Sequence, residues 1–214
     1  MSGKFLLLLA FTLFSSEWKS YRCIIKTTVT VSGNNTSTLL TIACKRDGTD
    51  VSIRTTQLAP EKGRFISISK NGEESVFYPE NGELIRRSQV YSEQVNLDSL
   101  TNSLFRAGLG SSAFIACRMP KEIGALIGAD SLTAYRNFNG TSVCDSITFF
   151  KGVLPISKTV LLKNYIQTDG NQFLMPTSIT TESFSPKVST KIEYSGYRIN
   201  AEIPDESFNS RFLE

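Results

Sequence analysis

The sequence predicts a mainly β fold: an antiparallel β-sandwich or β-barrel with one or two short helices in the middle of the chain. Apolar and polar residues alternate over many short segments of the 214-residue chain, which is typical of strands that bury one face. Turn-forming residues separate these segments at intervals of about eight to fifteen residues. The alternation breaks once, in a central region where apolar residues follow a helical spacing.

The N-terminal β half is predicted at residues 21–94 and begins with the clearest strand, at 23–31. The apolar residues of this strand recur at every second position and share one face: Cys23, Ile25, Val29 and Val31. A Ser-Gly-Asn-Asn turn follows. The same reasoning predicts further strands at residues 38–44, 51–55, 64–69 and 75–78.

Residues 95–134 are predicted to be a helix-containing crossover between two β halves. Asp98 can cap a helix that ends toward Gly108, and a second short helix is predicted at 120–127. Between them, alternation predicts a strand at 112–118.

The C-terminal β half is predicted at residues 135–214 and forms one composite domain with residues 21–94. Strands are predicted at 132–137, 142–150, 160–166, 173–175, 187–194 and 197–203. The last ten residues are mostly polar, with Phe208 and Phe212 four positions apart, a spacing that predicts a docked helical turn or a frayed tail.

An apolar run near the N-terminus determines the predicted compartment. Residues 5–14 follow Lys4 and resemble the apolar region of a secretory signal peptide, predicted at residues 1–20 with a cut between Ser15 and Tyr21. The run is shorter than the about 20 residues that a membrane-spanning helix needs, so no transmembrane anchor is expected in the mature chain. The sequence therefore predicts a secreted, extracellular protein. The alternative is a buried strand or core helix of an intracellular protein.

Cysteines and glycosylation motifs agree with export. The four cysteines, an even number, predict two disulfides whose connectivity stays open; the alternative is free, buried thiols. The disulfide candidates are Cys23, Cys44, Cys117 and Cys144. Three Asn-x-Ser/Thr motifs lie at predicted turns, and their glycosylation candidates are Asn34, Asn35 and Asn139.

The composition excludes several kinds of site. The chain has no histidine, which removes serine-histidine catalysis, histidine metal sites and histidine pH switches. The net charge of +3 comes from interspersed lysine and arginine and gives no nucleic-acid signature. Ser67 and Lys70 have the spacing of a serine nucleophile and its base, but a strand places them on opposite faces. No catalytic, cofactor-binding or metal-binding residue is predicted.

These observations predict a secreted, disulfide-stabilised, N-glycosylated protein that acts as a non-enzymatic binding module for an unknown protein or small-molecule ligand. One alternative is a viral structural or host-interacting protein with a jelly-roll-like β body. A third is a carboxylate-dependent hydrolase, for which the acidic pairs 73–74 and 205–206 supply carboxylates.

Overall fold

The structure is a computed structural model that describes residues 18–48, 50–70, 73–88, 112–118, 124–125, 128–140, 142–168 and 171–213. Twelve strands lie within these residues. Those of the first half are β1 (Ser20–Val31), β2 (Asn34–Asp47), β3 (Asp50–Ala59), β4 (Ile66–Lys70), β5 (Glu73–Tyr78) and β6 (Glu83–Ser88). Those of the second half are β7 (Ser112–Arg118), β8 (Ser131–Phe138), β9 (Ser142–Lys151), β10 (Leu154–Thr168), β11 (Asn171–Phe184) and β12 (Lys187–Ile199).

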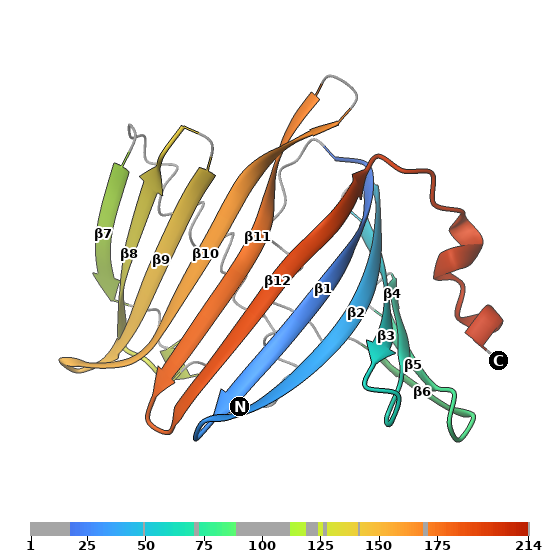
Figure 1. Cartoon of the computed structure of the whole chain (residues 1–214), viewed down its shortest axis with the longest axis horizontal. Coiled ribbons are helices and arrows are strands. Elements are labelled where there is room, and N and C mark those ends of the chain that lie inside the picture. Colours follow the sequence, from blue (N-terminus) through green and yellow to red (C-terminus); the bar gives the residue numbers. More distant parts are fainter. Residues whose placement is uncertain are drawn as a thin grey trace. The chain divides into compact units, whose positions relative to one another are not determined.

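The strands are hydrogen-bonded in the order β6-β5-β4-β3-β2-β1-β12-β11-β10-β9-β8-β7 (Figure 1). The predicted mainly β fold is therefore confirmed. The predicted sandwich or barrel is not supported, because the hydrogen bonding follows one linear order with β6 and β7 as its edges. Period-two alternation shows that a strand buries one face, but the same pattern occurs in a single open sheet.

The chain forms two compact units, each built from several stretches of sequence. Unit 1 contains residues 1–15, 29–35 and 93–192, and unit 2 contains residues 16–28, 36–92 and 193–214. The predicted division at 21–94, 95–134 and 135–214 stays a prediction.

Unit 1 buries one face of the antiparallel strands β8, β9 and β10. Directly paired residues of antiparallel strands share a face, and Ala134, Ile147 and Thr159 form one such row across the three strands. The buried apolar side chains of this face are Leu132, Ala134, Val143, Ile147, Phe149 and Leu161. We call it the core face of unit 1.

Unit 2 buries residues on both faces of its sheet. One face carries Leu40, Ile42 and Cys44 from β2, all nearly inaccessible to solvent. On the opposite face, the C-terminal segment packs over β2 and β4–β6 through two short 3-10 helices, η1 (Asp205–Phe208) and η2 (Ser210–Leu213). Its buried cluster comprises Ile68, Ile203, Phe208 and Leu213, with Ala43, Ile66, Phe77 and Leu84 packed against it.

The C-terminal segment is also held by polar contacts. Lys45 Nζ lies 2.7 Å from Asp205 Oδ1, and Arg54 Nη1 donates to the Ser207 carbonyl at 3.1 Å. The Lys45 hydrogen bond holds the pKa of the Asp205 carboxyl below its usual value. Of the two predicted outcomes for the last ten residues, the docked turn is therefore the one observed.

The two predicted central helices lie wholly or mostly outside the described residues. The helix predicted from Asp98 lies outside the described residues. Of the second, at 120–127, only Gly124 and Ala125 are described, and both are helical. The predicted leader, apart from Trp18, Lys19 and Ser20 at its end, is also outside the described residues.

Candidate functional site

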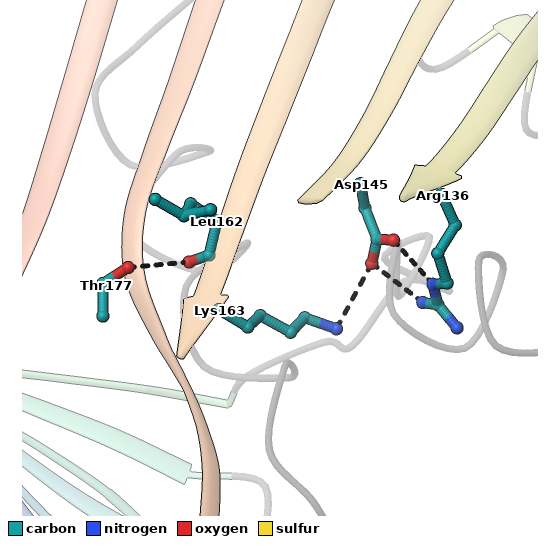
Figure 2. Close-up of polar contacts among 5 residues, drawn as sticks. All are labelled: Arg136, Asp145, Leu162, Lys163 and Thr177. Carbon is teal, nitrogen blue, oxygen red and sulfur yellow. Dashed lines mark hydrogen bonds and ion pairs between the residues drawn. The ribbon is translucent and has the colours of Figure 1, made fainter. Parts of the chain in front are cut away.

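A buried charged triad lies on the core face of unit 1. Arg136 of β8 makes a bidentate ion pair with Asp145 of β9, from Nε to Oδ1 at 2.6 Å and from Nη2 to Oδ2 at 2.8 Å. Lys163 of β10 reaches Oδ2 of the same carboxylate, with its Nζ 3.4 Å away. Figure 2 shows the three side chains converging from three successive strands. The Asp145 side chain is 1% exposed and the Lys163 side chain 6%.

Strand register explains why these three side chains meet. Arg136 and Asp145 are direct partners across β8 and β9, whereas Lys163 pairs with Val143, one step along the same face from Asp145. Charged groups at such depth require partners, because an isolated buried charge costs several kcal/mol. The triad therefore joins three strands by contacts that depend on one carboxylate.

A β-bulge next to the triad changes the path of β11. The β10–β11 register shifts between Leu162 and Lys163, so Thr177 is an extra residue on β11. Thr177 Oγ1 donates to the Leu162 carbonyl at 3.2 Å, as Figure 2 shows. The neighbouring Pro176 has no N–H to give to the ladder, and a bulge is where an inner strand tolerates proline. Bulges redirect side chains, and this one lies directly opposite Lys163.

An aromatic and thiol cluster occupies the start of unit 2. The rings of Trp18 and Tyr21 meet edge to face, with centroids 4.9 Å apart, and the Arg46 guanidinium lies 4.3 Å from the centroid of the Trp18 ring. The Cys44 thiol donates a hydrogen bond to the Tyr21 hydroxyl at 2.9 Å. The other members of the cluster are Cys23, Tyr194 and Tyr197. These buried groups fill the core rather than forming an accessible site.

The predicted disulfides are wrong for the described cysteines. Cys23, Cys44 and Cys144 are all free thiols; Cys23 and Cys44 are buried and Cys144 is half-buried. The side chain of Cys117 lies outside the described residues. The alternative of buried thiols acting as small apolar side chains fits Cys23 and Cys44. Burial and the nearby Cys44 raise the pKa of Cys23 well above its usual range. Burial likewise raises the pKa of Cys44 to about 12, although the Tyr21 hydrogen bond and Arg46 oppose this.

These pKa shifts predict slow alkylation of Cys23 and Cys44 in the folded protein. At pH 8, a thiol with a pKa of about 12 is ionised in about one molecule in ten thousand, and only the thiolate reacts. We expect iodoacetamide to label Cys144 before either buried cysteine, as measured by peptide mass spectrometry. The matched control is the same reaction in guanidinium chloride, where all sites should react. Rapid labelling of Cys44 under native conditions would contradict this prediction.

A groove of about 580 Å³ lies in unit 2 and is basic. Three arginines line it: Arg22 of β1, Arg54 of β3 and Arg198 of β12. Its other lining residues are Cys23, Ile24, Thr41, Ile42, Ala43, Thr56, Gly196 and Ser207, so no carboxylate is among the lining residues that the structure describes. Sequence reasoning missed this groove, because the three arginines are far apart in the chain.

The acidic pairs suggested for a hydrolase are partly brought together. Glu73, Asp205 and Glu206 line a second groove of about 470 Å³, which also contains Lys70. Asp205 is already paired with Lys45. Ser67 donates to the Glu74 carboxylate at 3.1 Å, so its hydroxyl takes part in a strand contact. Within the described ranges no three histidine, cysteine, aspartate or glutamate residues are grouped as a metal site.

The asparagines of the glycosylation motifs lie at or beside turns. Asn34 and Asn35 are exposed at the start of β2, and Asn35 Oδ1 accepts a hydrogen bond from Thr30 Oγ1 at 2.7 Å. Asn139 is exposed, and its Oδ1 accepts hydrogen bonds from the backbone N–H and the hydroxyl of Ser142. Whether any of them carries a glycan stays a prediction. A search of the described part of the chain finds no helix with the length and apolar character needed to cross a membrane.

Comparison with known proteins gives similarity of fold rather than of sequence. No protein-family model matches the chain, and no curated protein matches it in sequence. Three solved bacterial structures match it along nearly its whole length.

A putative outer membrane lipoprotein-sorting protein domain from Vibrio parahaemolyticus has a TM-score of 0.55 at 12% identity, and the match covers 98% of this chain and 97% of that one. A DUF1329 family protein from Desulfovibrio piger has a TM-score of 0.55 at 12% identity and covers 99% and 97%. A LolA superfamily protein from Nitrosomonas europaea has a TM-score of 0.52 at 14% identity and covers 99% of both chains.

These matches overturn the predicted secreted, disulfide-stabilised, N-glycosylated module and its viral jelly-roll alternative. The carboxylate-dependent hydrolase alternative stays a prediction. A jelly roll needs two stacked sheets, whereas the observed strand order is linear and the similar structures include LolA-type proteins. The chain has the fold of these three bacterial structures.

Proposed function

We propose that this protein is a non-enzymatic carrier that binds the acyl chain of a lipid or of a lipid-modified protein. The observation that carries the proposal is the fold, which corresponds end to end with a lipoprotein-sorting domain and a LolA superfamily protein.

Exposed apolar side chains in unit 1 support an apolar ligand. Phe114 of β7 and Tyr135 of β8 are direct cross-strand partners, with 68% and 45% of their surfaces exposed. Most of the other large exposed apolar residues also belong to unit 1: Val31, Phe138, Val153, Leu154, Tyr165 and Phe184. Exposed apolar side chains that lie side by side, as Phe114 and Tyr135 do, mark places where proteins meet lipids, ligands or partners. In this proposal the acyl chain binds to the apolar surface of unit 1.

The proposal places the protein outside the cytoplasm, where the leader predicted at residues 1–20 would direct it. A carrier needs no chemistry beyond binding and release, in agreement with a sequence that lacks histidine. The buried triad then has a structural role: it holds β8, β9 and β10 in register beneath the surface that carries Tyr135.

A binding measurement with chains of different length tests the proposal. About ten buried methylene groups, at about 0.8 kcal/mol each, correspond to a Kd of about 1 µM. The protein is purified without detergent, its lipids are extracted for mass spectrometry, and a fluorescent fatty acid is titrated into the delipidated protein. We expect co-purified acyl lipid, saturable binding, and competition by palmitate that exceeds competition by laurate.

Substitutions of exposed apolar residues test where the acyl chain binds without changing the buried core. The double variant Phe114→Ser/Tyr135→Ser should weaken fatty-acid binding by about 30- to 150-fold, because it removes about 2 to 3 kcal/mol of apolar contact. The control Leu58→Ser/Ile85→Ser changes two apolar residues of unit 2 that are 40% and 39% exposed. It should bind as the unchanged protein does. Absence of bound lipid together with absence of saturable fatty-acid binding would rule out the carrier function.

A further inference from the structure

We infer that the three-arginine groove of unit 2 is a binding site for a phosphate group attached to an apolar or neutral moiety. This site is separate from the acyl-binding surface proposed for unit 1 and does not depend on it. The argument rests on register, on the arginines' lack of carboxylate partners, and on the groove's dimensions.

Strand register brings two of the arginines face to face. β12 and β1 are neighbours in the sheet (Figure 1). The Asn200 N–H donates to the Ser20 carbonyl at 2.7 Å, and a Cβ added to Gly196 would lie 3.7 Å from Ile24 Cδ1. Along a regular antiparallel pair, the numbers of opposite residues have a constant sum, and these two contacts have the same sum. The register is therefore continuous between them. Arg22 and Arg198 share that sum, so they lie opposite each other between the two contacts. Like charges directly opposite each other on paired strands are destabilising.

The third arginine approaches the same face from β3. Arg54 pairs with Ala43, which lines the groove together with Thr41 and Thr56, themselves a direct pair. Arg54 Nη1 donates to the Ser207 carbonyl, which fixes the guanidinium at the wall formed by the C-terminal segment. The C-terminal segment thus closes one side of the groove and orients one of its cations.

No acidic group in the described residues compensates these charges. Arg22, Arg54 and Arg198 take part in none of the ion pairs found among those residues, and no carboxylate lines the groove there. Three arginines that line one groove, together with the threonines Thr41 and Thr56 and with Ser207, provide many donors and few acceptors. An anion with several oxygens satisfies such a set, and arginine matches phosphate through paired N–H donors.

The size and lining of the groove indicate more than a bare ion. A volume of about 580 Å³ lies in the range of small-molecule sites and exceeds what one phosphate fills. Ile24, which is 39% exposed, and Ala43 add apolar surface beside the cations. The ligand class is therefore a phosphomonoester or phosphodiester with a neutral or apolar substituent. Two sources have this chemistry: the headgroup of an anionic phospholipid and a soluble organic phosphate.

Two probes and a matched pair of variants test this inference. Glycerol 3-phosphate is titrated by calorimetry, and vesicles of phosphatidylglycerol with phosphatidylcholine are compared with phosphatidylcholine alone by co-sedimentation. The variants are Arg22→Gln and Arg198→Gln. The control is Lys26→Gln, which removes an exposed positive charge from the same face of β1, four residues along from Arg22, outside the groove.

We expect at least one probe to bind, with each arginine variant weakening binding by about tenfold and Lys26→Gln changing it by less than about threefold. Saturable binding of glycerol 3-phosphate identifies a soluble phosphate as sufficient, whereas binding only to phosphatidylglycerol vesicles identifies a lipid headgroup. If Lys26→Gln lowers the affinity for the probe as much as the arginine variants do, the probe is attracted by the basic surface in general and not by the groove. That result, or no binding of either probe, overturns the inference.

Thermal unfolding provides a second readout that a purely structural role would not produce. Because Arg22 and Arg198 repel each other in the empty groove, replacing one of them should leave the Tm unchanged or raise it while phosphate binding falls. A marked fall in Tm for both variants would show that these arginines stabilise the fold and would argue against a binding site.

Discussion

Replacing Asp145 by asparagine is expected to lower the free energy of unfolding by about 3 to 5 kcal/mol. The change keeps the size of the side chain but removes the one carboxylate that Arg136 and Lys163 share. Removing one partner of a buried ion pair is strongly destabilising, and here the substitution removes the contacts that two cations make with the same carboxylate. Urea unfolding at pH 7 measures the loss. Because the group is buried, the loss should change little between 0.05 and 0.5 M salt.

The control for Asp145→Asn is Glu182→Gln. Glu182 is an exposed acid on β11, also within unit 1, and it pairs with Lys158 across β10. Exposed substitutions of this kind usually change stability by less than about 0.5 kcal/mol. If Asp145→Asn costs no more than Glu182→Gln, the triad does not hold the strands of unit 1 together.

The triad shows where the alternation rule could have been taken further. Period-two alternation correctly predicted β8, β9 and β10 as strands. The same alternation places Arg136 on the face of β8 that carries Ala134. On β9, Asp145 lies on the same face as Val143 and Ile147. A charged residue in an otherwise apolar row is the signal for a buried ion pair. Because isolated charges are nearly always exposed, such a residue is easily taken for a surface residue.

Strand ends were harder to predict than strand existence. Residues 173–175 were predicted as a short strand, yet β11 continues past Pro176 to Phe184 through a bulge. Separate strands were predicted at 187–194 and 197–203, yet Ser195 and Gly196 between them lie inside β12, where Gly196 adopts a φ of +62°. In both places a local breaker was accommodated by hydrogen bonds to neighbouring strands, which no local window of sequence contains.

The arrangement of strands and the basic groove depend on long-range pairing. Arg22 and Arg198 meet because β12 returns beside β1, and nothing in either segment specifies that neighbour. The even number of cysteines was also misleading, because a cysteine count does not show whether two thiols meet in the fold and form a bond. Cys23 and Cys44 occupy apolar positions on adjacent strands, where a thiol serves as a small buried side chain without forming a bond.

Alkaline pH is expected to unfold the protein cooperatively, because several buried acids keep their protons only in the folded state. Burial raises the pKa of Tyr21, Tyr194 and Tyr197 well above the usual tyrosine value, and it raises those of Cys23 and Cys44 as well. Above the ordinary pKa of each group the unfolded chain releases the proton and the folded chain does not. The stability from these groups is therefore complete below about pH 8 and falls as pH rises.

The size of the effect follows from the number of groups. Each one removes about 1.4 kcal/mol per pH unit once pH exceeds its unfolded pKa, so the set removes roughly 10 kcal/mol by pH 11. That loss is comparable to the whole stability of a typical domain. We expect urea midpoints to fall steeply from about pH 9 and the folded state to be lost near pH 11.

Two tyrosine variants separate this mechanism from general effects of alkali, such as lysine deprotonation. Tyr21→Phe keeps the edge-to-face contact with Trp18 and removes one buried acid, so its stability should fall less steeply with pH by about 1.4 kcal/mol per unit above pH 10. It should also be slightly less stable at pH 7, because the Cys44 thiol loses its acceptor.

The control is Tyr165→Phe, at a tyrosine that is 46% exposed, and its stability should change with pH as that of the unchanged protein does. Identical slopes for Tyr21→Phe and the unchanged protein would mean that Tyr21 ionises without unfolding the start of unit 2, and the cluster around Trp18 would then be open to solvent.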